Sequence, residues 1–194
     1  MAGHPTYPTA GRQYVSTGFT LVEFLVVTTM IVVVSAIALP AFSAYYEKGC
    51  IMAAVSEITG MIREAKQRAL AQEQCFALGF NPASGRVSLI SGRGHDGKWN
   101  TDDDVLVRSF RLTDKGGGLR FGYGGCGPVP GLAADKDGVT FQSNNTLVCN
   151  PDLTGSAGAV YLITRSGTAM AIVMNSTDFG YKLWRWNGKK WERL

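Results

Sequence analysis

The side chains best suited to binding a metal ion gather in one short segment. Asp96, Asn100, Asp102 and Asp104 carry oxygen ligands there, and calcium prefers carboxylate and amide oxygens. Their spacing differs from that of an EF-hand loop, and Asp and Asn side chains also cap their own backbone in solvated turns. The segment is therefore open to two interpretations, a calcium site or a polar turn.

A second candidate site lies near the C-terminus, where residues 181–193 interleave basic and aromatic side chains. Basic groups can bind phosphates and tryptophan rings can stack on bases. A nucleic-acid contact is thus a hypothesis for six residues, Lys182, Trp184, Arg185, Trp186, Lys189 and Lys190. The alternative is a terminal hairpin turning at Asn187–Gly188, whose aromatic side chains cover a sheet and whose cations guard its edge.

Residue patterns typical of catalysis are missing from the sequence. We find no paired histidine and acid, no nucleophile elbow and no glycine loop of the kind that cradles phosphate after a strand. The formal charge of +4 is too small to indicate nucleic-acid binding by the whole protein. The chain is therefore expected not to be an enzyme and, apart from calcium, to need no cofactor.

The four cysteines, Cys50, Cys75, Cys126 and Cys149, could form disulfides in an oxidising compartment. They contain no CxxC pair, which disfavours a zinc site. A continuous helix would hold Cys50 and Cys75 about 37 Å apart, whereas a disulfide needs Cα atoms within about 7 Å. The preferred bridge is therefore Cys126 with Cys149, with Cys50 free or paired elsewhere.

An apolar run from residue 19 to residue 42 dominates the N-terminal part. Its only charge is Glu23, and at about 1.5 Å per residue a helix of this length crosses a bilayer core. A polar leader, residues 1–18, precedes the run. A secretory signal would instead be cleaved after the apolar run, and the Ala-Ile-Ala pattern ending at Ala38 keeps that alternative open.

The stretch Gly-Phe-Thr-Leu-Val-Glu-Phe-Leu-Val-Val, residues 18–27, resembles the processing motif of type IV prepilins and type II secretion pseudopilins. The resemblance implies that a prepilin peptidase cuts between Gly18 and Phe19 and that Phe19 becomes the N-methylated first residue. It also implies an assembly role for Glu23, whose carboxylate would pair with the new amino group of a neighbouring subunit. Since a lone charge in hydrocarbon costs roughly 2.5–3.5 kcal/mol, a partner is expected on physical grounds too.

Pro40 interrupts the apolar run in its last quarter. A proline there removes a backbone hydrogen bond and bends or locally opens the helix. The resemblance assigns Pro40 to filament assembly, because helices of this family often carry a proline at this point. A tolerated transmembrane proline is the alternative.

Residues 43–74 are expected to continue the helix in amphipathic form, and residues 75–194 to form a β-rich head. One apolar stripe recurs every three or four residues, at Ile51, Val55, Ile58, Ile62, Ala65 and Ala69. Alternating patterns predict a hairpin and further strands, over residues 76–80, 86–90, 105–110, 139–141, 159–163, 168–174 and 181–186. The predicted fold class is α+β: a long helix, transmembrane then amphipathic, packed on an antiparallel sheet.

The pattern of the head is similar to that of the GspH/FimT group of minor pilins and pseudopilins. The resemblance implies a minor subunit of a type IV pilus or a type II secretion filament. Its partners would be other pilin subunits, the prepilin peptidase and the inner-membrane assembly platform. It would cross the inner membrane once, with a periplasmic head, before joining the pilus or pseudopilus. A DNA receptor at the pilus tip, as some FimT-type proteins are, and a major filament subunit are the alternatives.

Overall fold

The described part of the chain forms two compact units. The structure, a computed structural model, describes residues 18–133, 135–176 and 180–194; most of the predicted leader lies outside them. One unit ends at Ala41 and the other runs from Phe42 to Leu194. Helix α1 (Leu21–Gln72) contributes its first part to one unit and its second part to the other.

Helix α1 is a single element that covers most of both ranges expected to be helical. Its second part is rich in Ala, Glu, Lys, Arg and Met, which are strong helix formers. Neither Gly49 nor Gly60 ends the helix. It stops where Glu73 takes a left-handed backbone conformation, with φ of 52°, as is common just after a helix C-terminus.

Two antiparallel sheets follow the helix. One has four strands in the order β3-β2-β1-β5, and the other has five in the order β4-β6-β7-β8-β9. The strands of the first are β1 (Phe76–Asn81), β2 (Arg86–Gly92), β3 (Val105–Arg111) and β5 (Thr146–Cys149). Those of the second are β4 (Arg120–Phe121), β6 (Gly158–Ile163), β7 (Ala169–Met174), β8 (Tyr181–Trp186) and β9 (Trp191–Arg193).

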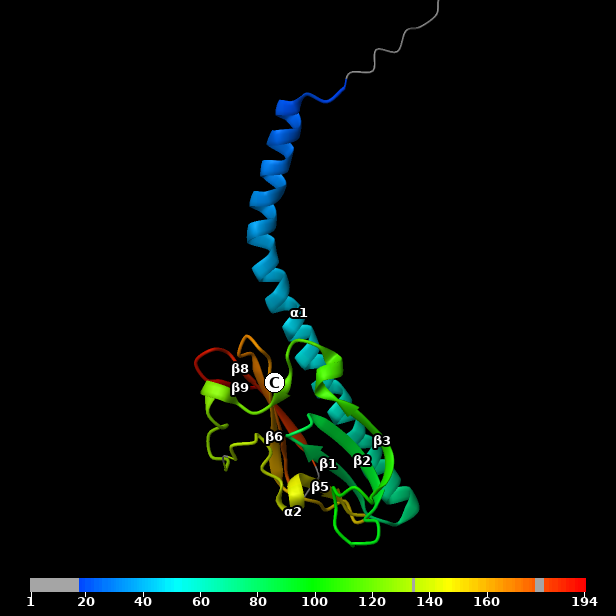
Figure 1. Ribbon diagram of the computed structural model, residues 1–194. Helices are drawn as coiled ribbons and strands as arrows, with labels where there is room; N and C mark the ends of the chain where they lie inside the picture. Colours follow the sequence, from blue (N-terminus) through cyan, green and yellow to red (C-terminus); the bar gives the residue numbers. More distant parts are fainter. Residues whose placement is uncertain (1–17, 134, 177–179) are drawn as a thin grey trace, which may run out of the picture. The chain divides into compact units, whose positions relative to one another are not determined.

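The main core of the head lies between α1 and both sheets (Figure 1). The predicted stripe is buried there as expected, with Ile51, Ile58 and Ala65 fully inaccessible. Period-two alternation turns Phe76, Leu78 and Phe80 of β1 toward the same core. The α+β class with antiparallel strands is therefore confirmed.

Each sheet also carries a smaller apolar cluster outside the main core. On the four-stranded sheet, Trp99 packs on Ala77 and Ile90. On the five-stranded sheet, Tyr161 and Trp191 belong to a larger cluster. Loops cover these faces, which explains why five of the six β1 residues are buried instead of every second one.

The structure corrects the predicted sheet in three respects. A single sheet was expected, but the strands divide between two. Residues 139–141 form no strand, since Val139 makes only an isolated bridge to Val160. Strands β4, β5 and β9 were not predicted, because runs of two to four residues are too short to show a period. The remaining elements are α2 (Gln142–Asn145) and the 3-10 turns η1 (Leu112–Lys115) and η2 (Gly124–Cys126).

Candidate functional site

The predicted cleavage point lies immediately before the start of α1. Gly18 and Phe19 have no regular secondary structure, and Phe19 is exposed. Thr20 caps the helix: its Oγ1 accepts the N–H of Glu23 at 3.2 Å, and its own N–H donates to Glu23 Oε2 at 3.0 Å. This reciprocal arrangement is a capping box. It satisfies two backbone donors at the helix start and holds the Glu23 carboxylate within its own chain.

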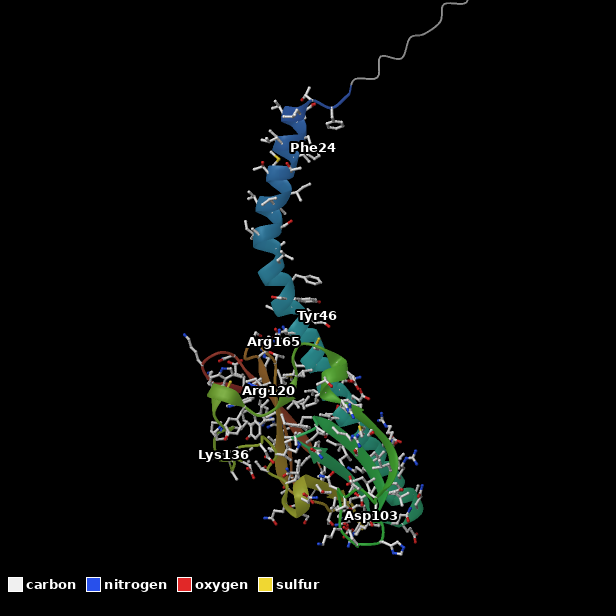
Figure 2. The ribbon with its side chains drawn as sticks, in the orientation of Figure 1. Phe24, Tyr46, Asp103, Arg120, Lys136 and Arg165 are labelled. Carbon is white, nitrogen blue, oxygen red and sulfur yellow. The ribbon has the colours of Figure 1, made fainter. Side chains whose placement is uncertain are left out.

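The first part of α1 presents apolar side chains all around. An 18-residue window has a mean hydropathy of 2.5, long and apolar enough to cross a membrane, and none of it is buried. Figure 2 shows the Phe24 side chain projecting from this part of the helix. The hydroxyls of Thr28 and Thr29 donate to backbone carbonyls one turn earlier, Thr29 to Leu25 at 2.7 Å, so neither donor needs water. Pro40 lies within the helix.

The C-terminal segment is the hairpin given above as the alternative to a DNA site. Strands β8 and β9 pair antiparallel, and the Asn187 N–H donates to the Lys190 carbonyl at 3.1 Å. The Asn187 side chain accepts from the N–H groups of both Lys189 and Lys190 at 2.9 Å, which stabilises the turn. Gly188 takes φ of 97° there.

The aromatic side chains of this hairpin are used in packing. Trp186 and Trp191 meet edge-on with ring centroids 5.7 Å apart, and Trp191 meets Tyr161 at 5.8 Å. Trp191 also donates its indole N–H to the Gly127 carbonyl at 3.1 Å. The cations Lys182, Lys189 and Lys190 are exposed, whereas Arg185 and both predicted stacking residues, Trp184 and Trp186, are partly buried. The structure thus brings Lys182, Lys189 and Lys190 to the surface, while Trp184 and Trp186 pack against the cluster that contains Tyr161.

The aspartate-rich loop between β2 and β3 is closed by its own hydrogen bonds; Figure 2 marks Asp103 within it. Asp103 accepts from the Thr101 hydroxyl at 2.8 Å and from the N–H groups of His95 and Asp96. These bonds, that from Thr101 first, lower the pKa of Asp103. Asp96 and Asp104 likewise accept from the N–H groups of Lys98 and Thr101.

The four predicted calcium ligands do not come together as a cluster. Within the described ranges, no group of three or more His, Cys, Asp or Glu side chains is placed to hold a metal ion. Asn100 turns its amide N–H₂ toward the carbonyls of Phe80 and Asn144, at 3.1 and 2.8 Å. A calcium site at this loop stays a hypothesis.

The preferred disulfide is not formed. All four cysteines, each of which is described, are free thiols. Cys149 lies on β5 inside the main core, where burial raises its pKa to about 12. Cys126 packs instead against the cluster on the other face of the five-stranded sheet. The expectation was wrong because it assumed a single glycine-rich loop joining the two cysteines, whereas they lie in separate apolar clusters.

Contacts between the helix and the β6–β7 turn were not predicted. Glu47 of α1 accepts from the N–H of Ser166 at 3.0 Å and from its hydroxyl at 2.5 Å. The Ser166 hydroxyl is the main reason why the Glu47 pKa lies below its ordinary value. Nearby, a Cβ on Gly117 would approach the Cys50 side chain to 3.0 Å. No signal in the sequence joins residues that lie 119 positions apart.

Comparison with known proteins gives one likeness. No family model matches the chain, and no curated protein does. A solved structure to which it is similar is the minor pseudopilin EpsH from the type 2 secretion system of Vibrio cholerae, with a TM-score of 0.44 and 11% identity. The alignment covers 68% of this chain and 94% of that one. At this identity and TM-score the likeness supports no conclusion about function.

Proposed function

We propose that this chain is a minor pilin-like subunit that is processed after Gly18 and assembles into a type IV pilus or type II secretion filament through its N-terminal helix. The observation that supports this most directly is where α1 begins. The helix starts at Leu21, so two residues separate the predicted cleavage bond from its first turn, and the bond lies in a segment without secondary structure. A peptidase that binds its substrate in an extended conformation can cut such a bond because the bond lies outside the helix.

The apolar surface of the first part of α1 supports the same role. Phe24 is 68% exposed and Ile37 is 74% exposed. A helix that is apolar on all sides needs either lipid or other helices as its surroundings. A filament subunit uses both in turn, because the helix lies in the membrane before assembly and against other subunits afterwards.

Glu23 would act in the docking step. The capping box shows where its carboxylate finds donors in the isolated chain, at Thr20. Cleavage at Gly18 would create an α-amino cation at Phe19, and the same cation on an incoming subunit would compete for the carboxylate. A buried, paired charge is far less costly in hydrocarbon than a lone one.

The test is to coexpress the full chain with and without a prepilin peptidase and to determine the N-terminus and intact mass of the membrane-extracted protein. The proposal expects a chain that starts at methylated Phe19 only when the peptidase is present. The variant Gly18→Glu should stay uncut, while the matched variant Gly49→Glu, which changes an exposed glycine farther along α1 where a side chain meets no neighbour, should be cut normally. A wild-type chain that starts after Ala38 would rule the proposal out.

A further inference from the structure

We propose that a cleft beside Trp99 binds a small organic anion through carboxylate or phosphate oxygens. The cleft has a volume of about 490 Å³, which lies in the range of small-molecule sites. Its walls come from the loop between β2 and β3, which bears Arg93 and Lys98, and from α2, which bears Ser143 and Asn144; Trp99 also lines it. The proposal is independent of the processing and assembly proposed above.

The two charged residues that line the cleft, Arg93 and Lys98, are both cations. Arg93 and Lys98 are both exposed, and neither forms a salt bridge with any residue that the structure describes. Among the carboxylates of the same loop, Asp96 accepts a hydrogen bond from the N–H of Lys98, and Asp103 accepts from the N–H groups of His95 and Asp96. Two cations are thus available for an anion from outside.

Trp99 supplies a buried donor that lacks an acceptor. The residue is only 7% exposed, and its indole nitrogen is buried with no hydrogen-bond partner in the described part of the chain. A buried N–H without a partner is rare in native proteins and calls for a specific reason. The Arg93 guanidinium lies over the indole ring at 5.0 Å from its centroid. A ligand oxygen that reaches the indole N–H would provide the missing acceptor.

The two walls are held together by hydrogen bonds between their backbones and amide side chains. Asn100 donates to the Asn144 carbonyl at 2.8 Å, and Asn144 donates in return to the Asn100 carbonyl at 2.9 Å. The Asn144 amide also reaches the Trp99 carbonyl at 3.3 Å. This reciprocal pair fixes the width of the cleft before any ligand arrives, and a preformed site loses less entropy on binding.

The wall formed by α2 has an unusual backbone. Ser143, Asn144 and Asn145 are three successive residues with positive φ, between 54° and 61°. Such conformations are strained for residues other than glycine and persist only where neighbouring contacts hold them. This backbone places Ser143 in the lining of the cleft with Arg93 and Lys98, and its hydroxyl would offer the anion a third donor.

The test follows the indole N–H signal of Trp99 by NMR. The full chain, ¹⁵N-labelled and solubilised in detergent, has four tryptophans, so its indole signals can be assigned by single Trp→Phe substitutions. Citrate and inorganic phosphate are titrated separately at constant ionic strength, balanced with sodium chloride. We expect a saturating shift of the Trp99 signal with at least one of them. Citrate alone would indicate a polycarboxylate ligand, and phosphate alone a phosphorylated one.

Substitutions connect that shift to the cleft. Arg93→Gln should weaken binding about ten-fold, the effect of losing one charge-assisted hydrogen-bonding pair. The matched control Arg120→Gln removes an exposed arginine from another part of the head (Figure 2) and should bind as the wild type does. The proposal is overturned if neither anion gives a saturating shift, if sodium chloride gives the same shift, or if Arg93→Gln binds as tightly as Arg120→Gln.

Discussion

The two parts of helix α1 differ in how exposed their apolar side chains are. From residue 21 to residue 41 the large apolar side chains are exposed on every side, as with Ile31 at 58% and Ile37 at 74%. Beyond residue 50 most of them lie in one stripe, where Ile51 and Ile58 are fully buried against the sheets, although Met52 and Leu70 are exposed. The first part of the helix thus needs apolar surroundings from outside the head, whereas the second part finds them within the head.

The two parts of α1 therefore differ in what covers their apolar surface. The stripe of the second part is satisfied within the chain, since both sheets cover it. The apolar surface of the first part remains available, and it needs lipid or a second chain. Substitutions in the two parts should therefore change different measured quantities, and this separation can be tested directly.

The largest expected effect on stability comes from truncating the buried stripe. Ile58→Ala removes a fully buried side chain and should lower the free energy of unfolding by about 2–5 kcal/mol. Near-UV circular dichroism of the detergent-solubilised chain in a denaturant titration measures this. The matched substitution Ile37→Ala changes the exposed surface and should leave the unfolding midpoint of the head unchanged. Equal losses in both variants would contradict the separation.

A smaller effect is expected from the aromatic cluster of the terminal hairpin. Trp191→Phe keeps an aromatic ring but loses the hydrogen bond to the Gly127 carbonyl, which should lower the free energy of unfolding by about 1 kcal/mol. Lys190→Gln, one residue earlier and exposed, should not change it.

The same pair of variants tests the DNA hypothesis. Fluorescence anisotropy with labelled single- and double-stranded DNA measures affinity at two salt concentrations. If the hairpin only packs, wild type and Lys190→Gln should both bind weakly and alike. Affinity that falls steeply with salt and falls again in Lys190→Gln would instead establish a phosphate contact.

Local patterns predicted much of this fold. The apolar run, the stripe from Ile51 to Ala69 and the hairpin of β1 and β2 all appear as expected, because each depends on a period visible within a few residues. The division into two sheets was missed. It depends on which strands meet across the head, and β5 joins β1 from a distance of about seventy residues along the chain.

The candidate site was predictable to the same degree. The capping pair Thr20 and Glu23 falls within one turn, although only an assembly role was predicted for Glu23. The bonds of Glu47 to Ser166 and of Asn100 to Asn144 join distant segments and have no local signal. The disulfide prediction failed for the same reason, since it required a distance between Cys126 and Cys149 that only the tertiary structure sets.

A pH-dependent effect is expected where α1 meets the β6–β7 turn. Hydrogen bonds, that from the Ser166 hydroxyl first, place the Glu47 pKa below its ordinary value of 4.5. The ionised carboxylate therefore stabilises the head fully above about pH 4.5, and this contribution is lost as the pH falls through the lowered pKa. The melting temperature of Glu47→Gln should lie below that of the wild type at neutral pH, and the difference between the two melting temperatures should disappear in acid. A difference independent of pH would contradict a role for the charge.

The smallest effect on stability is expected in the aspartate-rich loop. Substitutions of two neighbouring residues there distinguish a polar turn from a calcium site. Asp103 closes the turn by accepting from Thr101, Asp96 and His95, and its lowered pKa reflects those bonds. Asp103→Asn should therefore lower the melting temperature slightly without calcium present. Asp102 is exposed and belongs only to the proposed calcium ligands, so Asp102→Asn should change nothing.

Calcium chloride then separates the two interpretations of this loop. In a polar turn Asp96, Asp103 and Asp104 already accept from backbone N–H groups, and millimolar calcium should leave the melting temperature of the wild type unchanged. A ligand that binds only the folded state raises stability with its concentration. A calcium-dependent rise that persists in Asp103→Asn and disappears in Asp102→Asn would therefore establish the metal site, and would mean that the loop exchanges some of its own hydrogen bonds for ligation.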